Sequence, residues 1–207
     1  MIVIDDNFKS IVAGVKEGRV AYSNIRKIVY FLVSCGLAEV FFFCLAMIFD
    51  LPMPLVAIQL LWLNVVTDGI QDLALSFEKA ESGIMKEKPR DPKENLFDKN
   101  LFHEIMFSGL VIGLLVFSVW YFLINIMKFE TTMARGYIMA LMVFIQNIHV
   151  FNCRSEKNST FTVSLKTNKL IGIAFVSSII LQLIVRNVPL FSKFLQTTPI
   201  TIIELIY

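Results

Sequence analysis

The hydrophobic residues of this chain form five long runs separated by short polar stretches. The runs are Ile28–Phe49, Leu55–Leu75, Ile105–Met127, Ala134–Cys153 and Leu170–Val188. The first three contain 22, 21 and 23 residues, and roughly 20 are needed to cross the hydrocarbon core of a bilayer. The pattern predicts an all-α membrane protein with five transmembrane helices.

Composition agrees with this prediction. The chain is 56% hydrophobic with a mean hydropathy of +0.68, whereas soluble domains are roughly 45–50% apolar. The net charge of +2 indicates no nucleic-acid partner. Cys35, Cys44 and Cys153 are too few for a disulfide framework, so we interpret them as packing residues. We expect an integral, multi-pass protein surrounded by membrane lipid.

Basic residues predict the orientation. If the five runs cross the membrane, 15 of the 19 lysines and arginines lie on one side. They precede the first run, follow the second and follow the fourth; only Lys128, Arg135, Arg186 and Lys193 lie on the other side. The positive-inside rule places the N-terminus and the two basic loops in the cytoplasm.

The two ends of the chain resemble parts of larger elements. Met1–Asn7 has the pattern of a short buried strand, and the proline-free segment from Phe8 to Phe49 predicts one continuous helix. Ile200–Tyr207 has the pattern of a further apolar helix, but eight residues cover only about 12 Å. We therefore expect a remnant of an α/β domain at the start and a truncated sixth span at the end.

Polar residues inside the apolar runs predict a cation site. Asn64, Thr67 and Asp68 lie within the second run and Glu39 within the first. A carboxylate at bilayer depth costs at least about 2.5–3.5 kcal/mol, so it indicates function by default. The spacing i, i+3, i+4 predicts that Asn64, Thr67 and Asp68 share one helix face. Oxygen ligands without sulfur suit calcium, magnesium, sodium or protons; the alternative is a set of buried acids that only fixes helix packing.

Two stretches carry a family resemblance. The first stretch comprises Asp5–Phe8, Ile11–Ala13 and Glu17–Arg19, and the second is Gln59–Gly69. Together they resemble the C-terminal part of a P-type cation-transporting ATPase. The chain is most similar to the calcium-pump branch that includes the sarco/endoplasmic-reticulum and secretory-pathway pumps. The resemblance implies that the five spans correspond to family helices five to nine.

The resemblance also implies a domain organisation. Residues 1–19 would be the tail of the phosphorylation domain and the start of a stalk helix, and residues 20–75 the stalk and first two spans with the ion site. Residues 76–100 would be a cytoplasmic loop that contacts the phosphorylation domain, and residues 101–207 the remaining spans.

The family's phosphorylation motif, Asp-Lys-Thr-Gly, does not occur in the 207 residues. ATP and magnesium would therefore bind only in the missing domains, the missing N-terminal part of the same pump would be the partner, and the chain alone would be inactive. In a bacterium the membrane would be the plasma membrane.

Family roles can be transferred to matching positions. The resemblance implies that Asn64 and Asp68 ligate the transported ion, most simply calcium, and that Thr67 and Glu39 belong to a companion site. Gln146 aligns with a glutamate of the companion site in two-ion calcium pumps. Because Gln146 lacks that negative charge, the sequence favours one good site over two.

Two further departures concern the same region. The family pattern Asn-x-x-Glu is Gly36-x-x-Glu39 here, so one oxygen ligand is missing. After Gly69, which permits a helix break, the calcium pumps usually have proline at the position of Gln71. Asp72 comes next in the chain. The simplest interpretation is that its side chain lies at a solvated helix end; the alternatives are that it is an ion ligand, a proton carrier or a charge at the cytoplasmic mouth.

Two motifs have ordinary interpretations. Gly109-x-x-x-Gly113 indicates close helix packing, with Gly36 as a matching flat position. His149 could modulate proton counter-transport, although a packed, hydrogen-bonded histidine is the simpler interpretation.

Two other functions stay open on the sequence alone. Oxygen ligands do not select calcium over sodium, protons, magnesium or manganese, so a pump for another hard cation is possible. A catalytically inert, truncated membrane bundle is the alternative from a different class.

Overall fold

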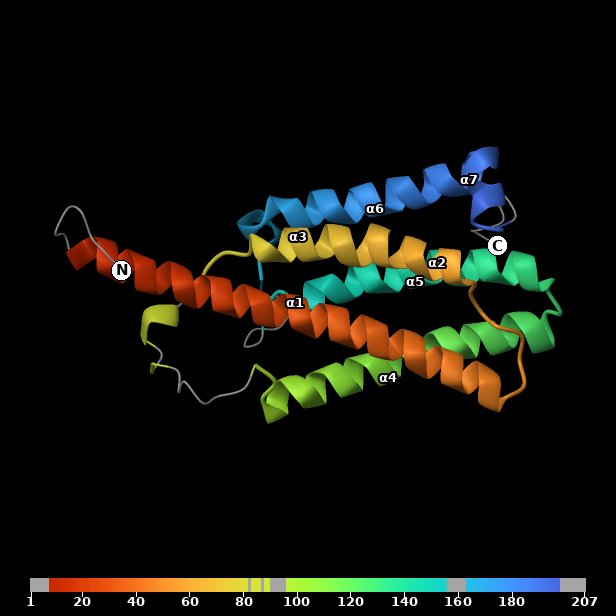
Figure 1. Cartoon of the computed structure of the whole chain (residues 1–207), viewed down its shortest axis with the longest axis horizontal. Coiled ribbons are helices and arrows are strands. Elements are labelled where there is room, and N and C mark those ends of the chain that lie inside the picture. The colour runs from red at the N-terminus through yellow and green to blue at the C-terminus, as the bar shows by residue number, and fades with distance from the viewer. Residues whose placement is uncertain (1–7, 82, 87, 90–95, 156–162, 198–207) are drawn as a thin grey trace.

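A computed structural model of the chain describes residues 8–81, 83–86, 88–89, 96–155 and 163–197. Its core is a bundle of long helices packed side by side (Figure 1). Four helical segments in the described part are long and apolar enough to cross a membrane: α1 Phe8–Ile48, α4 Lys99–Tyr121 with its π-helical extension η3 Phe122–Ile126, α5 Thr131–Asn152 and α6 Lys169–Asn187. The prediction of an all-α membrane region is confirmed.

The second apolar run, Leu55–Leu75, has a different structure. It folds as α2 Ala57–Leu63, the π-helix η1 Asn64–Gly69 and α3 Ile70–Ser76. The segment is helical throughout, but the hydrogen-bond pattern changes in its middle, where the polar residues of the predicted site lie. A π-helical turn of this kind is rare and frequently occurs at functional sites.

The remaining described elements are short. They are the 3₁₀ helices η2 Ile84–Lys86 and η4 Leu165–Thr167, and the helix α7 Pro189–Phe194. The predicted strand Met1–Asn7 and the predicted helix start Ile200–Tyr207 lie outside the described residues.

The continuous first helix is confirmed. α1 contains 41 residues, about 60 Å at 1.5 Å per residue, and is therefore about twice as long as the hydrocarbon core is thick. No proline interrupts it. Its N-terminal third extends beyond the bundle at one end (Figure 1).

Close packing of α1 against α4 explains the two glycines. A Cβ atom on Gly113 would lie 2.8 Å from the backbone oxygen of Ala38, and one on Gly109 would lie 2.7 Å from Cδ2 of Leu37. The packing role predicted for this motif is therefore confirmed. The prediction that Gly36 is the matching position is wrong, because no atom lies within 4 Å of a Cβ built there.

The connections between helices gather at the two ends of the bundle. The α1–α2 and α4–α5 connections and α7 lie at one end, and the segments after α3 and after α5 lie at the other (Figure 1). At the first end, the Arg135 guanidinium donates to the carbonyl of Met53 at 2.9 Å. The segments that carry most of the basic residues therefore lie at the same end of the bundle, as the charge pattern of the sequence predicts.

A buried ion pair joins three segments at the end with the basic loops. Arg154, at the end of α5, donates to the Glu78 carboxylate at 2.9 Å, and both side chains are buried. Asn168, which precedes α6, donates to the same carboxylate at 2.9 Å and to the carbonyl of Ala74 at 2.8 Å. We call this set the Glu78 junction.

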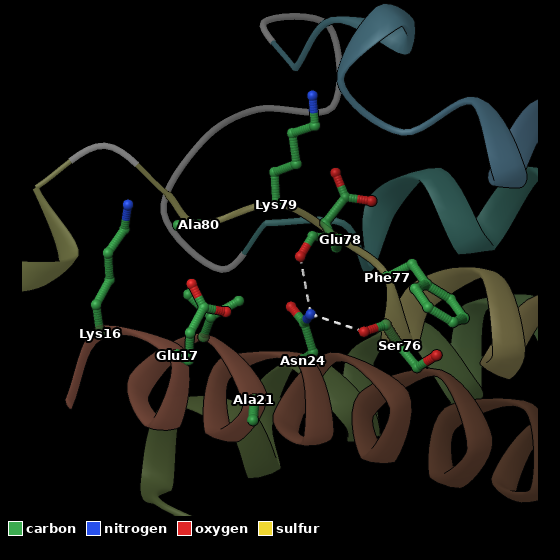
Figure 2. A pocket seen from close by; sticks show the side chains of 10 residues that line it. Lys16, Glu17, Ala21, Asn24, Ser76, Phe77, Glu78, Lys79 and Ala80 are labelled. Atoms are coloured by element: carbon green, nitrogen blue, oxygen red, sulfur yellow. Dashed lines mark hydrogen bonds between the residues drawn. The ribbon is translucent and has the colours of Figure 1, made fainter. Parts of the chain in front are cut away.

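α1 contacts the same junction through Asn24. Its amide nitrogen donates to the carbonyls of Ser76 at 3.0 Å and Glu78 at 2.8 Å (Figure 2). These residues border a surface pocket of about 580 Å³ between α1 and the segment after α3. Lys27 adds a 2.9 Å ion pair to Glu81. The long first helix is thus fixed by polar contacts to the segment that follows α3.

Candidate cation site

The π-helix η1 divides the three polar residues of the second apolar run. Thr67 and Asp68 are buried, whereas Asn64 is exposed. A π-helix closes its hydrogen bonds from i to i+5 rather than i to i+4, so the turn between Asn64 and Thr67 is wider than in an α-helix. Exposure therefore separates Asn64 from Thr67 and Asp68, which the i, i+3, i+4 spacing of a regular helix does not predict.

A chain of hydrogen bonds links η1, α5 and α1. The Thr67 hydroxyl lies 2.7 Å from Oε1 of Gln146, and Nε2 of Gln146 donates to the Glu39 carboxylate at 3.2 Å. The same hydroxyl also lies 3.3 Å from the Asp68 carboxylate and 2.7 Å from the carbonyl of Leu63. Four of the five predicted site residues are therefore brought together, and Asn64 lies on the outer side of the same turn.

This arrangement provides oxygen atoms of three chemical kinds. Glu39 and Asp68 contribute carboxylates, Thr67 a hydroxyl and Gln146 an amide oxygen. Such ligands are those that calcium takes, usually six to eight at a time. Within the described residues, no three histidine, cysteine, aspartate or glutamate side chains are grouped as a metal centre. The set fits a cation held partly by neutral oxygens rather than by carboxylates alone.

A second polar cluster lies beside this set. Gln71 on α3 donates its side-chain N–H to Oδ1 of Asn147 on α5, and the Ser178 hydroxyl on α6 lies 2.8 Å from the same oxygen. All three side chains are completely buried. From the sequence, Gln71 stands out only as a departure from the family pattern, and Asn147 and Ser178 do not stand out. Their signal was the presence of amides and a hydroxyl inside apolar runs, which is weaker than that of a carboxylate.

His149 and Asp72 lie near these clusters but have different surroundings. Nε2 of the buried His149 is 2.7 Å from the Ser34 hydroxyl and 3.5 Å from the Cys153 sulfur, and its ring packs edge-on against Tyr30. Asp72 is partly buried, and its Oδ1 is a buried atom with no hydrogen-bond partner among the described residues. His149 therefore links α1 to α5, as the simpler interpretation of the sequence predicts.

Comparison with known proteins extends over the whole chain. Residues 52–207 match the family described as "Cation transporting ATPase, C-terminus". The chain is 37% identical to "Calcium-transporting ATPase" of Bacillus subtilis over 97% of its length, and 32% identical to "Calcium-transporting ATPase type 2C member 1" of Homo sapiens over 100%. It is 28% identical to "Calcium-transporting ATPase 3, endoplasmic reticulum-type" of Arabidopsis thaliana over 97%.

These relatives are much longer than the chain. The matched region makes up 22% of the first two relatives and 23% of the third. The chain thus spans about a fifth of the length of the curated relatives that it matches.

Proposed function

The chain belongs to the cation-transporting ATPases, whose C-terminal region it matches, and on this premise we propose that it is the ion-binding transport part of an ATP-driven calcium pump. The names of its relatives support calcium as the transported ion. The observation that carries the proposal is the contact chain Thr67–Gln146–Glu39, in which Thr67 and Gln146 are buried and Glu39 is partly buried, beside Asp68 and across three helices.

Each polar residue of the site has a proposed role. Asp68 and Glu39 compensate the charge of the cation from two different helices, and Thr67 and Gln146 add neutral oxygens between them. Asn64 adds its amide oxygen from the exposed side of η1. Because the two carboxylates belong to separate helices, a movement of α1 relative to η1 changes the distance between them and with it the affinity for the ion.

The length of α1 suggests how that movement is driven. The helix runs from Glu39 to the segment that follows α3, where Arg19 donates to the carbonyl of Ile84 at 2.7 Å and Asn24 contacts the Glu78 junction. We assign ATP and magnesium binding, and phosphorylation, to a catalytic part of the pump outside these 207 residues. Residues 1–19 and the loop 76–100 are the proposed contacts with that part.

The orientation follows from the charge pattern. The N-terminus, the loop 76–100 and the α5–α6 connection are proposed to face the cytoplasm, because they carry most of the basic residues. The opposite end, with the connections α1–α2 and α4–α5, faces the other compartment. In a bacterial cell the membrane is the plasma membrane.

Substitution of the two carboxylates in the complete pump tests the proposal. Asp68→Asn should abolish calcium-dependent ATP hydrolysis, and Glu39→Gln should have a smaller effect. The exposed Asp50, at the end of α1, provides a matched control, because Asp50→Asn should leave the calcium dependence unchanged. If the activity of the pump depends instead on manganese, magnesium, sodium or protons, the proposed site residues stand but the transported cation is not calcium.

A second measurement addresses the inert alternative. The 207-residue polypeptide alone should form no acid-stable phosphoenzyme from labelled ATP, and the complete pump should form one. If the complete pump also forms none and shows no cation dependence, the chain belongs to a catalytically inert membrane bundle.

A further inference from the structure

Gln71 has a buried side-chain oxygen without a hydrogen-bond partner. The side chain is 0% exposed, and its Oε1 contacts no donor among the described residues. Leaving a buried acceptor without a donor is unfavourable, so an unsatisfied buried group in a native structure calls for a functional explanation. Thr67, on the preceding turn η1, differs in this respect, because its hydroxyl lies within 3.3 Å of three oxygens.

The orientation of Gln71 is fixed by its neighbours. Nδ2 of Asn147 donates to the carbonyl of Val143 at 2.7 Å, so Oδ1 is the atom that accepts from Gln71 and from Ser178. Because Oδ1 can only accept, the Gln71 amide must present its N–H₂ to Asn147. Its Oε1 therefore points away from Asn147, and the buried Asn147, itself held by Ser178, fixes that orientation.

Gln71 is adjacent to the candidate site along two helices. It lies four residues after Thr67, and residues at this spacing are neighbours on a helix surface. On α5, its partner Asn147 directly follows Gln146, the partner of Thr67. The contact Gln71–Asn147 thus lies next to the contact Thr67–Gln146. One residue further, the buried Oδ1 of Asp72 also has no partner among the described residues.

We propose that Gln71 is a further ligand of the transported cation and supplies its side-chain oxygen from α3; this inference rests on the proposed function. A neutral amide oxygen is a hard ligand suited to calcium. Position 36 of α1, one turn before Glu39, is glycine and offers no side-chain oxygen, whereas Gln71 offers an amide oxygen from α3. Asn147 and Ser178 are positioning residues that keep this oxygen turned away from α5.

Two substitutions separate a ligand from a residue that only fixes the helix. Gln71→Met keeps the length of the side chain and removes both the oxygen and the N–H₂. Gln71→Glu keeps an oxygen in place, replaces the N–H₂ that binds Asn147 by a second oxygen and adds a negative charge. Gln182 is the matched control, because it is a buried glutamine on α6 whose oxygen accepts from Trp62 at 2.9 Å.

The measurement is equilibrium binding of radioactive calcium to the purified complete pump. Gln71→Met should weaken binding by about tenfold or more, equivalent to about 1.4 kcal/mol. Gln71→Glu should bind calcium at least as tightly as the unsubstituted pump, within about threefold on the weaker side, because it keeps an oxygen and adds a negative charge. Gln182→Met should bind calcium like the unsubstituted pump. If Gln71→Met does not yield folded protein, Gln71→Glu decides alone, because a tenfold loss in that variant contradicts a ligand role.

Two results would overturn the inference while leaving the proposed function intact. Equal weakening by Met and Glu would show that Gln71 acts only through its N–H₂, as an anchor of α3. Unchanged binding in both variants would show that its oxygen does not reach the ion. Asp68→Asn in the same assay distinguishes a third case, since unchanged binding in that variant contradicts the proposed function itself.

Discussion

The Thr67 hydroxyl lies 2.7 Å from the side-chain oxygen of Gln146, and the nitrogen of the same amide donates to Glu39 at 3.2 Å. One neutral side chain therefore joins the π-helical turn to the long first helix. Its two ends are chemically different, so it can satisfy a hydroxyl and a carboxylate at once.

The first prediction concerns the charge of this bridging residue. Gln146→Glu replaces the donor to Glu39 by a second carboxylate, and two close carboxylates repel each other unless a cation lies between them. The melting temperature of the variant should fall in a calcium chelator and should be restored by calcium. Thermal unfolding of the detergent-solubilised pump, with and without calcium, measures this effect.

The control uses the glutamine on α6 that lies outside the site. Gln182→Glu also buries a new carboxylate, but it should not regain stability when calcium is added. If calcium restores both variants equally, or neither, the cation does not bind between Glu39 and position 146.

The second prediction ranks three glycine substitutions by the space around them. Gly113→Ala should destabilise most, by about 1–3 kcal/mol, because its methyl group would meet the backbone oxygen of Ala38, which no side-chain rotation can remove. Gly109→Ala should cost less, since the nearest atom belongs to the Leu37 side chain. Gly172→Ala, on the exposed side of α6 with no atom within 4 Å, should be neutral or slightly stabilising.

Thermal unfolding of the three variants in one detergent gives the ranking. A larger effect of Gly172→Ala than of Gly113→Ala would show that α1 and α4 are not closely packed at these positions.

Much of the fold could be predicted because apolar length alone indicates a transmembrane helix. α1 lacks proline, so its continuity from Phe8 could be read directly from the sequence. The π-helix between Asn64 and Gly69 could not, because composition does not report a change in hydrogen-bond spacing. That change separated Asn64 from Thr67, which a regular helix would have placed on one face.

The carboxylates of the site can be predicted from their chemistry, and Asn64, Thr67 and Gln146 from the family resemblance, whereas neither points to Asn147 or Ser178. Glu39 and Asp68 stand out because carboxylates are expensive in a membrane. Asn147 and Ser178 are ordinary polar residues, and only their common contact with Gln71 reveals a cluster. Gly36 was assigned to helix packing from its residue type, whereas the space around it shows that α4 does not approach it.

The third prediction concerns the Glu78 junction. Arg154→Met should destabilise the protein by about 3–5 kcal/mol, because it leaves the Glu78 carboxylate buried without its main partner. The double variant Arg154→Met, Glu78→Leu should recover much of that loss, since it removes both charges. Lys169→Met is the control: Lys169 is an exposed basic residue at the start of α6, and its loss should change the melting temperature little.

A double variant that is no more stable than Arg154→Met would contradict this account. It would mean that the hydrogen bonds from Asn168, rather than the ion pair, fix the three segments.

The fourth prediction concerns pH and the start of α4. Asp98 accepts a hydrogen bond from the backbone N–H of Leu101 at 2.8 Å and pairs with Arg26 at 3.1 Å. The backbone hydrogen bond, followed by the Arg26 charge, holds the pKa of Asp98 below its usual value. Since this pKa is lowered on folding, the stabilisation is complete above the unfolded value of about 4 and is lost as the pH falls through the folded value.

Asp98→Asn tests this interpretation, because asparagine also accepts at the N-cap but does not titrate. The variant should lose the stability step below about pH 4 that the unsubstituted protein shows when its melting temperature is followed by circular dichroism. An unchanged step in Asp98→Asn would assign it to another carboxylate.

The last prediction is the orientation of the bundle in the membrane. The α4–α5 connection contains the exposed Lys128, at the end opposite the Glu78 junction, and the segment after α3 contains the exposed Lys88. With Cys35, Cys44 and Cys153 replaced, an impermeant thiol reagent should label Lys128→Cys in intact cells. It should label Lys88→Cys only after lysis, because the basic loops remain in the cytoplasm. The reverse pattern would invert the bundle and separate the Glu78 junction from any cytoplasmic catalytic part. Labelling of both positions before lysis would place both ends of α4 on one side, which a membrane-spanning α4 does not allow.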